Sequence, residues 1–294
     1  MDRQAAIAIL FGCATALCWG FSDYFAARAT RVVGPLTAAF LVNTLGALTF
    51  ALIFVLFIRT PEKITWDGFL FASSGGVLVG LGSIAFFRSL AVGPITLVTP
   101  ISSVYPLVTA TITVSFFAVR LSIWQALGTI LVVFGVMLAT QVFVKHGRTG
   151  GGPRIALLAA GCWGAGFSLI AQAVGRIGWA HTTLIELAFV VLTFLVFLSF
   201  AEDRKQVFAK LNYRIAGSRF ILGAALIQLV GAVFFNVGLT YGPQAGPIVA
   251  SLSSTYPAIT VLLALRYFRE RLDPIPFAGA LIGIAGVVML SVGQ

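Results

Sequence analysis

The chain has 294 residues, of which 59% are hydrophobic and 10% are charged. A soluble domain of this length could not bury so much apolar surface, so the composition indicates a membrane protein and excludes a soluble one. The net charge of +10 does not indicate nucleic acid binding, because the basic residues fall mainly in short connections between apolar runs, where charge sets membrane topology.

Apolar runs along the chain predict ten membrane-spanning helices. Each run is roughly 18 to 25 residues long, enough to cross about 30 Å of hydrocarbon, whereas barrel strands would alternate in polarity and be about half as long. The first run is too long for a cleaved signal peptide and is interpreted as a retained helix. The predicted helices cover residues 4–28, 34–58, 67–90, 94–118, 121–143, 153–174, 180–200, 217–240, 243–266 and 274–292.

An internal repeat divides the chain into two related halves. The segment ISSVYPLVT at 101–109 returns 151 positions later as LSSTYPAIT at 252–260. Each copy contains five predicted helices, and because five is odd, the second copy must begin on the opposite side of the membrane. We therefore expect an all-α polytopic membrane protein with ten transmembrane helices in two inverted five-helix repeats, residues 1–144 and 153–294, joined by a flexible basic linker at 145–152.

The repeated segment predicts a central cavity. Each copy places a proline, Pro106 or Pro257, inside a predicted helix, which leaves the carbonyl four residues upstream without its usual partner. Such a carbonyl is tolerable at membrane depth only beside protein or a water-filled cavity. The other interpretation is a packing kink in which the serines bond to their own backbone. The substrate-cavity candidates from this segment are Ser102, Ser103, Tyr105, Pro106, Ser253, Ser254, Tyr256 and Pro257.

The first helices of the two halves also resemble each other. Cys18-Trp19-Gly20-Phe21-Ser22 has a counterpart in the segment from Cys162 to Ser168, which contains Trp163. Glycine permits close helix approach, and tryptophan provides a rigid amphipathic surface. Trp19 and Trp163 are therefore cavity candidates, with packing or interfacial anchoring as the other interpretation.

Polar residues inside the spans are functional candidates because they are costly in hydrocarbon. Glu186 lies about seven residues into its predicted helix and is the proton-coupling candidate, although it could instead hydrogen-bond to a neighbouring helix. Gln228 and Asn236 are cavity candidates, whereas for Asp23 and Arg88 we favour an interfacial ion pair or snorkelling. The remaining polar residues, which could line a pathway or cross-link helices, are Asn43, Gln125 and Gln172.

Motifs for catalysis and metal binding are absent from the sequence. There is no H-E-x-x-H, no G-x-S-x-G and no phosphate-binding loop, and the three cysteines have no C-x-x-C spacing. We therefore expect no enzyme activity, no catalytic residues, no metal and no cofactor. The expected partners are a small-molecule substrate and the lipid bilayer, without nucleic acid, and the expected state is a monomer or weak dimer.

Taken together, these motifs resemble the EamA-type branch of the drug/metabolite transporter superfamily. The resemblance rests on the C-W-G-F-S opening, the Gly-Pro pairs at 93–94 and 242–243, the S-S-x-Y-P motifs and the Arg-Glu-Arg-Leu segment at 269–272. It implies a ten-helix, multi-pass carrier of the inner or plasma membrane that moves small metabolites, often exporting amino acids or related compounds. A central cavity between the halves is also implied.

Two functions and two orientations follow from the sequence. The first function is a secondary transporter that works by alternating access, with proton coupling left open, and the alternative is a passive channel or facilitator. Fourteen basic residues follow odd-numbered helices and five lie on the other side, which predicts termini outside the cell. The family resemblance implies cytoplasmic termini, and the cargo stays open among amino acids, nucleosides, purine-like compounds and lipophilic cations.

Overall fold

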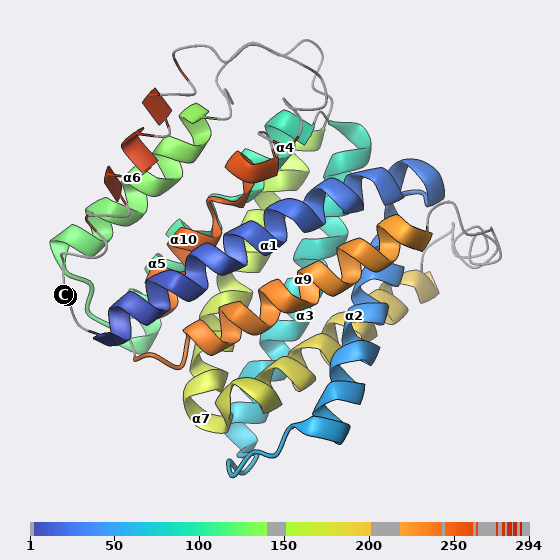
Figure 1. Ribbon diagram of the computed structural model, residues 1–294, viewed down its shortest axis with the longest axis horizontal. Coiled ribbons are helices and arrows are strands. Elements are labelled where there is room, and N and C mark those ends of the chain that lie inside the picture. The colour runs from blue at the N-terminus through green and yellow to red at the C-terminus, as the bar shows by residue number, and fades with distance from the viewer. Residues whose placement is uncertain are drawn as a thin grey trace.

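The computed structural model describes residues 3–93, 95–139, 151–200, 218–242 and 245–260, together with short segments between 263 and 289. Within these residues every element is an α-helix. The helices are α1 (Arg3–Val33), α2 (Pro35–Phe57), α3 (Trp66–Val92), α4 (Ile95–Ser102), α5 (Tyr105–Phe117), α6 (Ile123–Ala139), α7 (Gly152–Phe200), α9 (Ser218–Gly238) and α10 (Ala245–Ser253) (Figure 1).

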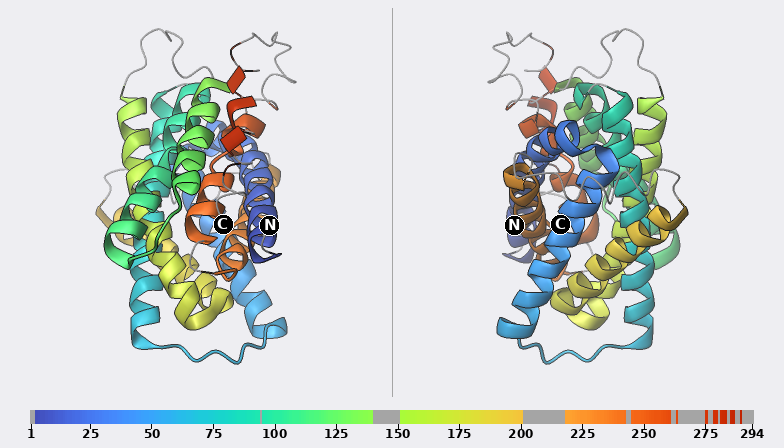
Figure 2. Two further views of the ribbon diagram at one scale, coloured as in Figure 1. Left: turned by 90° about the vertical axis from the view of Figure 1, so that its left-hand side faces the viewer. Right: turned by 90° about the vertical axis from the view of Figure 1, so that its right-hand side faces the viewer.

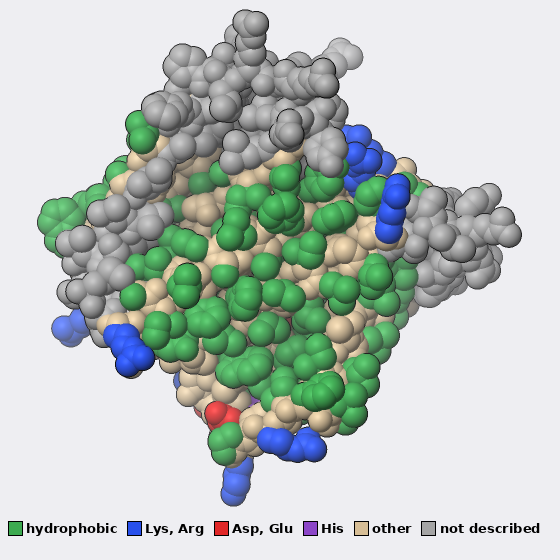
Figure 3. All heavy atoms as spheres, viewed as in Figure 1, with side chains coloured by type: hydrophobic (Ala, Val, Ile, Leu, Met, Phe, Trp, Pro, Cys, Tyr) green, Lys and Arg blue, Asp and Glu red, His purple; other side chains and the backbone are tan. Residues whose placement is uncertain are grey.

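Six of the described helical segments are long and apolar enough to cross a membrane. Hydrophobic side chains cover the broad face formed by α1 and α9, and Lys and Arg lie near its edges (Figure 3). Leucines on this face are exposed, as expected for a surface that meets lipid. The six segments are Ala6–Val33, Pro35–Phe57, Trp66–Val92, Val98–Phe117, Gly152–Phe200 and Arg219–Gly238.

Two glycines form the corners between the first and second helices of each half. Gly34 separates α1 from α2 with φ 87° and ψ 161°, and Gly178 interrupts α7 with φ 74° and ψ 163°. These angles are accessible essentially only to glycine. Since α7 changes direction at Gly178, it contains both of the helices predicted at 153–174 and 180–200. The two corners lie 144 residues apart and have the same conformation.

The predicted helices at 94–118 and 243–266 are both interrupted before the proline of the repeated segment. The chain leaves α4 at Ser102 and enters α5 at Tyr105, and it leaves α10 at Ser253 and becomes helical again at Tyr256. The proline therefore occupies the first turn of a new helix, where its missing N–H costs no helical hydrogen bond. This placement explains why each break lies before the proline.

The two halves share one core. Helix α1 packs along α9, and α3 packs along α7, so the first helix of each half lies against the third helix of the other (Figures 1 and 2). Small residues allow the helices to approach closely: a Cβ added at Gly20 would lie 2.9 Å from the Tyr256 carbonyl oxygen, and one added at Gly164 would lie 2.7 Å from that of Tyr105.

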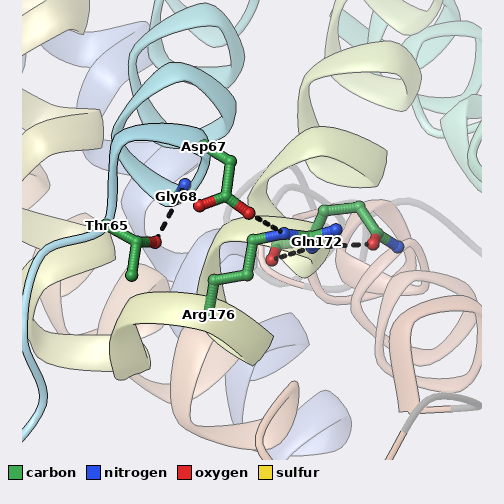
Figure 4. Close-up of polar contacts among 5 residues, drawn as sticks. All are labelled: Thr65, Asp67, Gly68, Gln172 and Arg176. Carbon is green, nitrogen blue, oxygen red and sulfur yellow. Dashed lines mark hydrogen bonds and ion pairs between the residues drawn. The ribbon is translucent and has the colours of Figure 1, made fainter.

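Connections of the two halves meet at the ends of the molecule. The α2–α3 connection crosses one end (Figure 2), where the Thr60 hydroxyl lies 3.3 Å from His181 Nδ1 beside the Gly178 corner. Arg176 of α7 forms a 2.8 Å ion pair with Asp67 of α3 at the same end (Figure 4). At another contact, Gly93 after α3 lies against Gly152 at the start of α7.

Some residues singled out in the sequence lie outside the described part of the chain. They are residues 145–150 of the linker, Pro94 and Pro243 of the two Gly-Pro pairs, and the Arg-Glu-Arg-Leu segment at 269–272.

Candidate functional site

A central cavity lies between the two halves. Its empty volume, which includes open solvent, is about 720 Å³. Helices α1, α2, α3, α5, α7 and α9 contribute to its wall, together with Tyr256 after α10. The lining residues are Trp19, Ser22, Asp23, Asn43, Val79, Ser83, Phe86, Phe87, Tyr105, Trp163, Phe167, Glu186, Leu187, Val190, Gln228, Ala232 and Tyr256.

Aromatic rings in contact with one another form much of the cavity wall. Trp19 stacks on Phe167, with ring centroids 5.7 Å apart, and Trp163 approaches Phe86 at 5.1 Å. Tyr105 meets the Trp163 ring edge-on at 6.3 Å. Aromatic pairs at these separations contribute about 0.5–1.5 kcal/mol each beyond burial. The wall therefore combines rigid rings from both halves.

Glycines on neighbouring helices fix the two tryptophans. A Cβ added at Gly231 of α9 would lie 2.7 Å from Trp19 Nε1, and a Cβ added at Gly82 of α3 would lie 2.7 Å from Trp163 Nε1. Real Cβ atoms do not approach this closely, so each indole edge occupies the space that a larger residue would fill. The two halves thus position their tryptophans in the same manner.

Two tyrosine–serine pairs connect the helix breaks. The Tyr105 hydroxyl lies 2.7 Å from Ser253 Oγ, and the Tyr256 hydroxyl lies 2.9 Å from Ser102 Oγ. All four side chains are buried. Tyr105 and Tyr256 are equivalent positions of the repeated segment, as are Ser102 and Ser253, so the contact is exchanged symmetrically between the two copies. The breaks therefore hold each other at the cavity.

The serines of the repeated segment lie behind the tyrosines and do not line the cavity. Ser102 and Ser253 also donate to their own helices, to the carbonyls of Thr99 and Ala250. The other two serines are buried and donate to carbonyls three residues upstream: Ser103 to Pro100 at 2.8 Å and Ser254 to Ser251 at 2.7 Å. Both interpretations of the segment thus describe part of it, because the tyrosines reach the cavity and the serines bond to backbone.

Glu186 is held in the cavity wall by α9. Its side chain is only 5% exposed, and its Oε2 accepts a 2.8 Å hydrogen bond from Asn236 Nδ2. The same amide donates to Thr183 Oγ1 at 2.9 Å. A carboxylate in this position is stabilised by the amide that faces it. Asn236 therefore contributes to the site by positioning Glu186, and it does not line the cavity itself.

The remaining predicted amides have different roles. Gln228 Nε2 donates to Asn43 Oδ1 at 3.3 Å, and both residues line the cavity. Gln125 accepts from the Ser122 backbone N–H at 2.9 Å and caps the start of α6. Gln172 accepts from Arg176 at 3.0 Å at the end of the molecule (Figure 4).

Asp23 corrects the expectation of an interfacial ion pair. It lines the cavity, and its Oδ2 is buried without a hydrogen-bond partner among the described residues. Arg88 forms no ion pair with it, and the Arg88 guanidinium lies 4.7 Å from the ring centroid of Phe197. The sequence predicted that the first helix ends at 28, but α1 continues to Val33, so Asp23 lies ten residues before its end. The carboxylate is therefore deeper than predicted.

The structure brings six of the predicted site residues to the cavity wall: Trp19, Tyr105, Trp163, Glu186, Gln228 and Tyr256. Ser102, Ser253 and Asn236 each contact one of these six, and Ser103, Ser254, Pro106 and Pro257 lie in or just after the breaks. Among the lining residues that were not predicted, Phe167 could have been found from the sequence, because it belongs to the second Cys-Trp-Gly segment. No sequence feature distinguishes Phe86 and Phe87, because they lie in an apolar run like the others.

Comparisons with known proteins support this picture. The model of the EamA-like transporter family matches residues 6–141 and again residues 152–292. An uncharacterized transporter of Archaeoglobus fulgidus is 23% identical over 287 residues, covering 96% of this chain and 97% of that protein. An uncharacterized protein of Methanocaldococcus jannaschii is 28% identical over 134 residues, which is 45% of this chain and 94% of that protein. A crystal structure of another protein has a TM-score of 0.69 at 14% identity, covering 97% of both chains, and so shares the fold.

Proposed function

Because the chain belongs to the EamA-like transporter family, we propose that this multi-pass membrane transporter is a secondary carrier of a small metabolite in the cytoplasmic membrane. It works by alternating access, exposing one central site to each side in turn. The expected cargo is an amino acid or a related compound, and the expected direction is export.

The observation that carries the proposal is the cavity between the halves, flanked by two broken helices. Broken helices at membrane depth are tolerated only where they meet protein or line a cavity, and in carriers they occur at the substrate site. Here Tyr105 and Tyr256 stand at the two breaks, and both line the cavity.

Two inverted five-helix repeats account best for the contacts between the halves. The Thr109 hydroxyl donates to the Gly164 carbonyl at 3.1 Å, and its repeat counterpart Thr260 donates to the Gly20 carbonyl at 3.3 Å. Such exchanged contacts are expected for two units related by a twofold axis. In this arrangement α4 and α5 form one span, α7 forms two, and the helical residues after 274 belong to the tenth.

Transport in proteoliposomes tests the proposal. Labelled amino acids, amines, nucleosides and purines are each offered to vesicles that contain the purified full-length protein. A carrier gives saturable uptake that is accelerated by unlabelled substrate on the other side, and Tyr256→Ala abolishes this counterflow. Flux that rises linearly with concentration and shows no counterflow would establish the passive channel instead, and flux unaffected by Tyr256→Ala would contradict the assigned site.

Proton coupling is proposed to involve Glu186. Its carboxylate faces a cavity whose other titratable groups are Asp23, Tyr105 and Tyr256, and it is paired with the neutral amide of Asn236. A carboxylate at membrane depth is suited to bind and release a proton. Glu186→Gln is therefore expected to abolish the stimulation of uptake by a pH gradient, while counterflow at equal pH persists with a raised KM. Gradient-driven uptake at the wild-type rate would exclude this role.

A further inference from the structure

Two carboxylates face the central cavity, and no basic side chain faces it. Asp23 of α1 and Glu186 of α7 both line it, whereas no Lys, Arg or His is among the described lining residues. The two acids come from different halves of the chain. A charge at this depth is costly unless an opposite charge compensates it, and the described wall supplies none.

Several hydrogen-bond donors of the cavity wall are already used by the protein. The Ser22 hydroxyl donates to the Ala224 carbonyl at 3.1 Å, Asn43 Nδ2 donates to the Ala39 carbonyl at 2.8 Å, and Gln228 Nε2 donates to Asn43 Oδ1. The two tyrosine hydroxyls are paired with serines. The donors that remain among the described lining residues, such as the indole N–H groups of Trp19 and Trp163, are uncharged, so the wall offers a bound anion no charged donor.

Hydrogen-bond acceptors, in contrast, remain available. Asp23 Oδ2 is buried and has no partner in the described part of the chain. Glu186 Oε2 accepts from Asn236, but an ionised carboxylate has about four acceptor positions, so capacity remains. The cavity thus presents unsatisfied acceptors, which is the chemistry that recognises a donor with positive charge.

The helix breaks do not provide the anion site that helix starts often provide. Pro106 and Pro257 have no N–H, and the residues that follow them already donate: Leu107 N–H to the Val104 carbonyl at 3.1 Å, and Ala258 N–H to the Thr255 carbonyl at 3.0 Å. A substrate carboxylate would therefore find little compensation at the breaks.

Aromatic rings complete a site for a cation. The faces of Trp, Tyr and Phe rings attract positive charge, most strongly when water is excluded. Seven of the lining residues are aromatic, and they come from both halves: Trp19, Phe86, Phe87, Tyr105, Trp163, Phe167 and Tyr256.

We propose that the cavity binds an organic cation, with its ammonium group at Asp23 and Glu186 and its apolar body against the aromatic wall. This inference rests on the proposed transport function and narrows its expected cargo, from amino acids and related compounds to the related amines. Zwitterions bind more weakly because their carboxylate lacks a basic partner, and anions are rejected because both carboxylates repel them.

A series of ligands with one skeleton tests the charge preference directly. Binding of 2-phenylethylamine, phenylalanine, 3-phenylpropionate and 2-phenylethanol to the purified full-length protein is measured by calorimetry. The amine is expected to bind at least about tenfold more tightly than the zwitterion, the anion and the alcohol, and with a Kd below about 10 mM. Equal or tighter binding of any of the other three, or no detectable binding of the amine, would overturn the proposal.

Substitutions of the two carboxylates test whether the amine binds in the central cavity. Asp23→Asn and Glu186→Gln are each expected to weaken amine binding by roughly tenfold or more, while binding of the alcohol stays unchanged. Glu62→Gln is the matched control, since Glu62 lies in the exposed α2–α3 connection and its pKa is held below the usual range by hydrogen bonds from Thr60 and its own backbone N–H. Amine binding that survives both cavity substitutions would place the site elsewhere.

The two proposals fail in different ways. Counterflow of neutral or anionic compounds without amine binding would remove the cation site and leave the carrier function standing. Amine binding that obeys the series, without counterflow of any compound, would remove the carrier function and leave the cation site standing.

Discussion

The Tyr105 hydroxyl lies 2.7 Å from Ser253 Oγ, across the boundary between the two halves. The equivalent pair of the repeat lies on the same boundary, where the Tyr256 hydroxyl is 2.9 Å from Ser102 Oγ. Each helix break is thus held by the other, and each tyrosine that lines the cavity has its position set by a serine 148 or 154 residues away in the chain.

A double-mutant cycle on Tyr105→Phe and Ser253→Ala is expected to show coupling. Ser253→Ala leaves the buried Tyr105 hydroxyl without its partner and should lower the free energy of unfolding by about 1–3 kcal/mol. Tyr105→Phe should cost less, because Ser253 still donates to the Ala250 carbonyl. The double substitution should cost less than the sum of the two, because no orphaned hydroxyl remains. Unfolding of purified protein in detergent measures these energies. Tyr241→Phe is the control, since no hydrogen bond of its hydroxyl is found among the described residues; strict additivity would contradict the pairing.

Alanine at Gly82 or Gly231 is expected to displace a cavity tryptophan. The added Cβ would come within 2.7 Å of Trp163 Nε1 or Trp19 Nε1, so the indole must move or the helices must separate. We expect a loss of stability of about 1–3 kcal/mol and a larger loss of substrate binding. Tryptophan fluorescence and ligand titration report both effects.

Two other glycines provide the control for this prediction. Gly161 and Gly175 of α7 have nothing within 4 Å of an added Cβ, and alanine there should stabilise the helix by up to about 1 kcal/mol. If all four variants behaved alike, the close contact at the tryptophans would be refuted.

Asn236→Ala is expected to destabilise the protein more than Glu186→Gln. Removing the amide leaves both Glu186 Oε2 and Thr183 Oγ1 without their donor, at a cost of about 1.5–3 kcal/mol. The glutamine variant keeps an oxygen that can accept the same hydrogen bond, and it buries no charge. Thermal unfolding of the two variants measures their order of stability. If Glu186→Gln were less stable than Asn236→Ala, Asn236 would not be holding the carboxylate.

Gly178 and the Arg176–Asp67 ion pair lie at the same end of the molecule, but we expect them to contribute differently to the stability of the fold. Gly178→Ala forces a side chain into a conformation essentially reserved for glycine, costing about 1–3 kcal/mol. Asp67→Asn removes an exposed ion pair that water and salt screen, so its effect on stability should be smaller, and smaller still in high salt. Unfolding at low and high salt distinguishes the two variants, because only the effect of Asp67→Asn should depend on salt. A larger loss of stability in Asp67→Asn than in Gly178→Ala would contradict this prediction.

The sequence predicted the helical class of the fold and the positions of the breaks, because apolar run length and proline act locally. It also singled out Tyr105 and Trp163 as cavity candidates and Glu186 as a proton-coupling candidate, since repeat symmetry and the cost of polar groups in hydrocarbon do not depend on tertiary detail. It misplaced Asp23 because helix ends are set by capping and tertiary contacts, and a five-residue error at the end of α1 changed an interfacial residue into a cavity residue. Phe86 and Phe87 could not be assigned, since only packing decides which face of an apolar helix meets the cavity.

The pairing of α1 with α9 has a consequence for biosynthesis. The two helices are separated by roughly 185 residues, so at ribosomal rates of about 5–20 residues per second α1 is made roughly 10 to 40 s before α9 exists. During that interval the face of α1 that later packs on α9, where Phe11 and Trp19 lie against Gly238 and Gly231, can be covered only by lipid or by the insertion machinery. Assembly of the first half therefore has to wait for the second, and a premature stop after α6 would leave a chain whose first and third helices lack their main packing partners, α9 and α7.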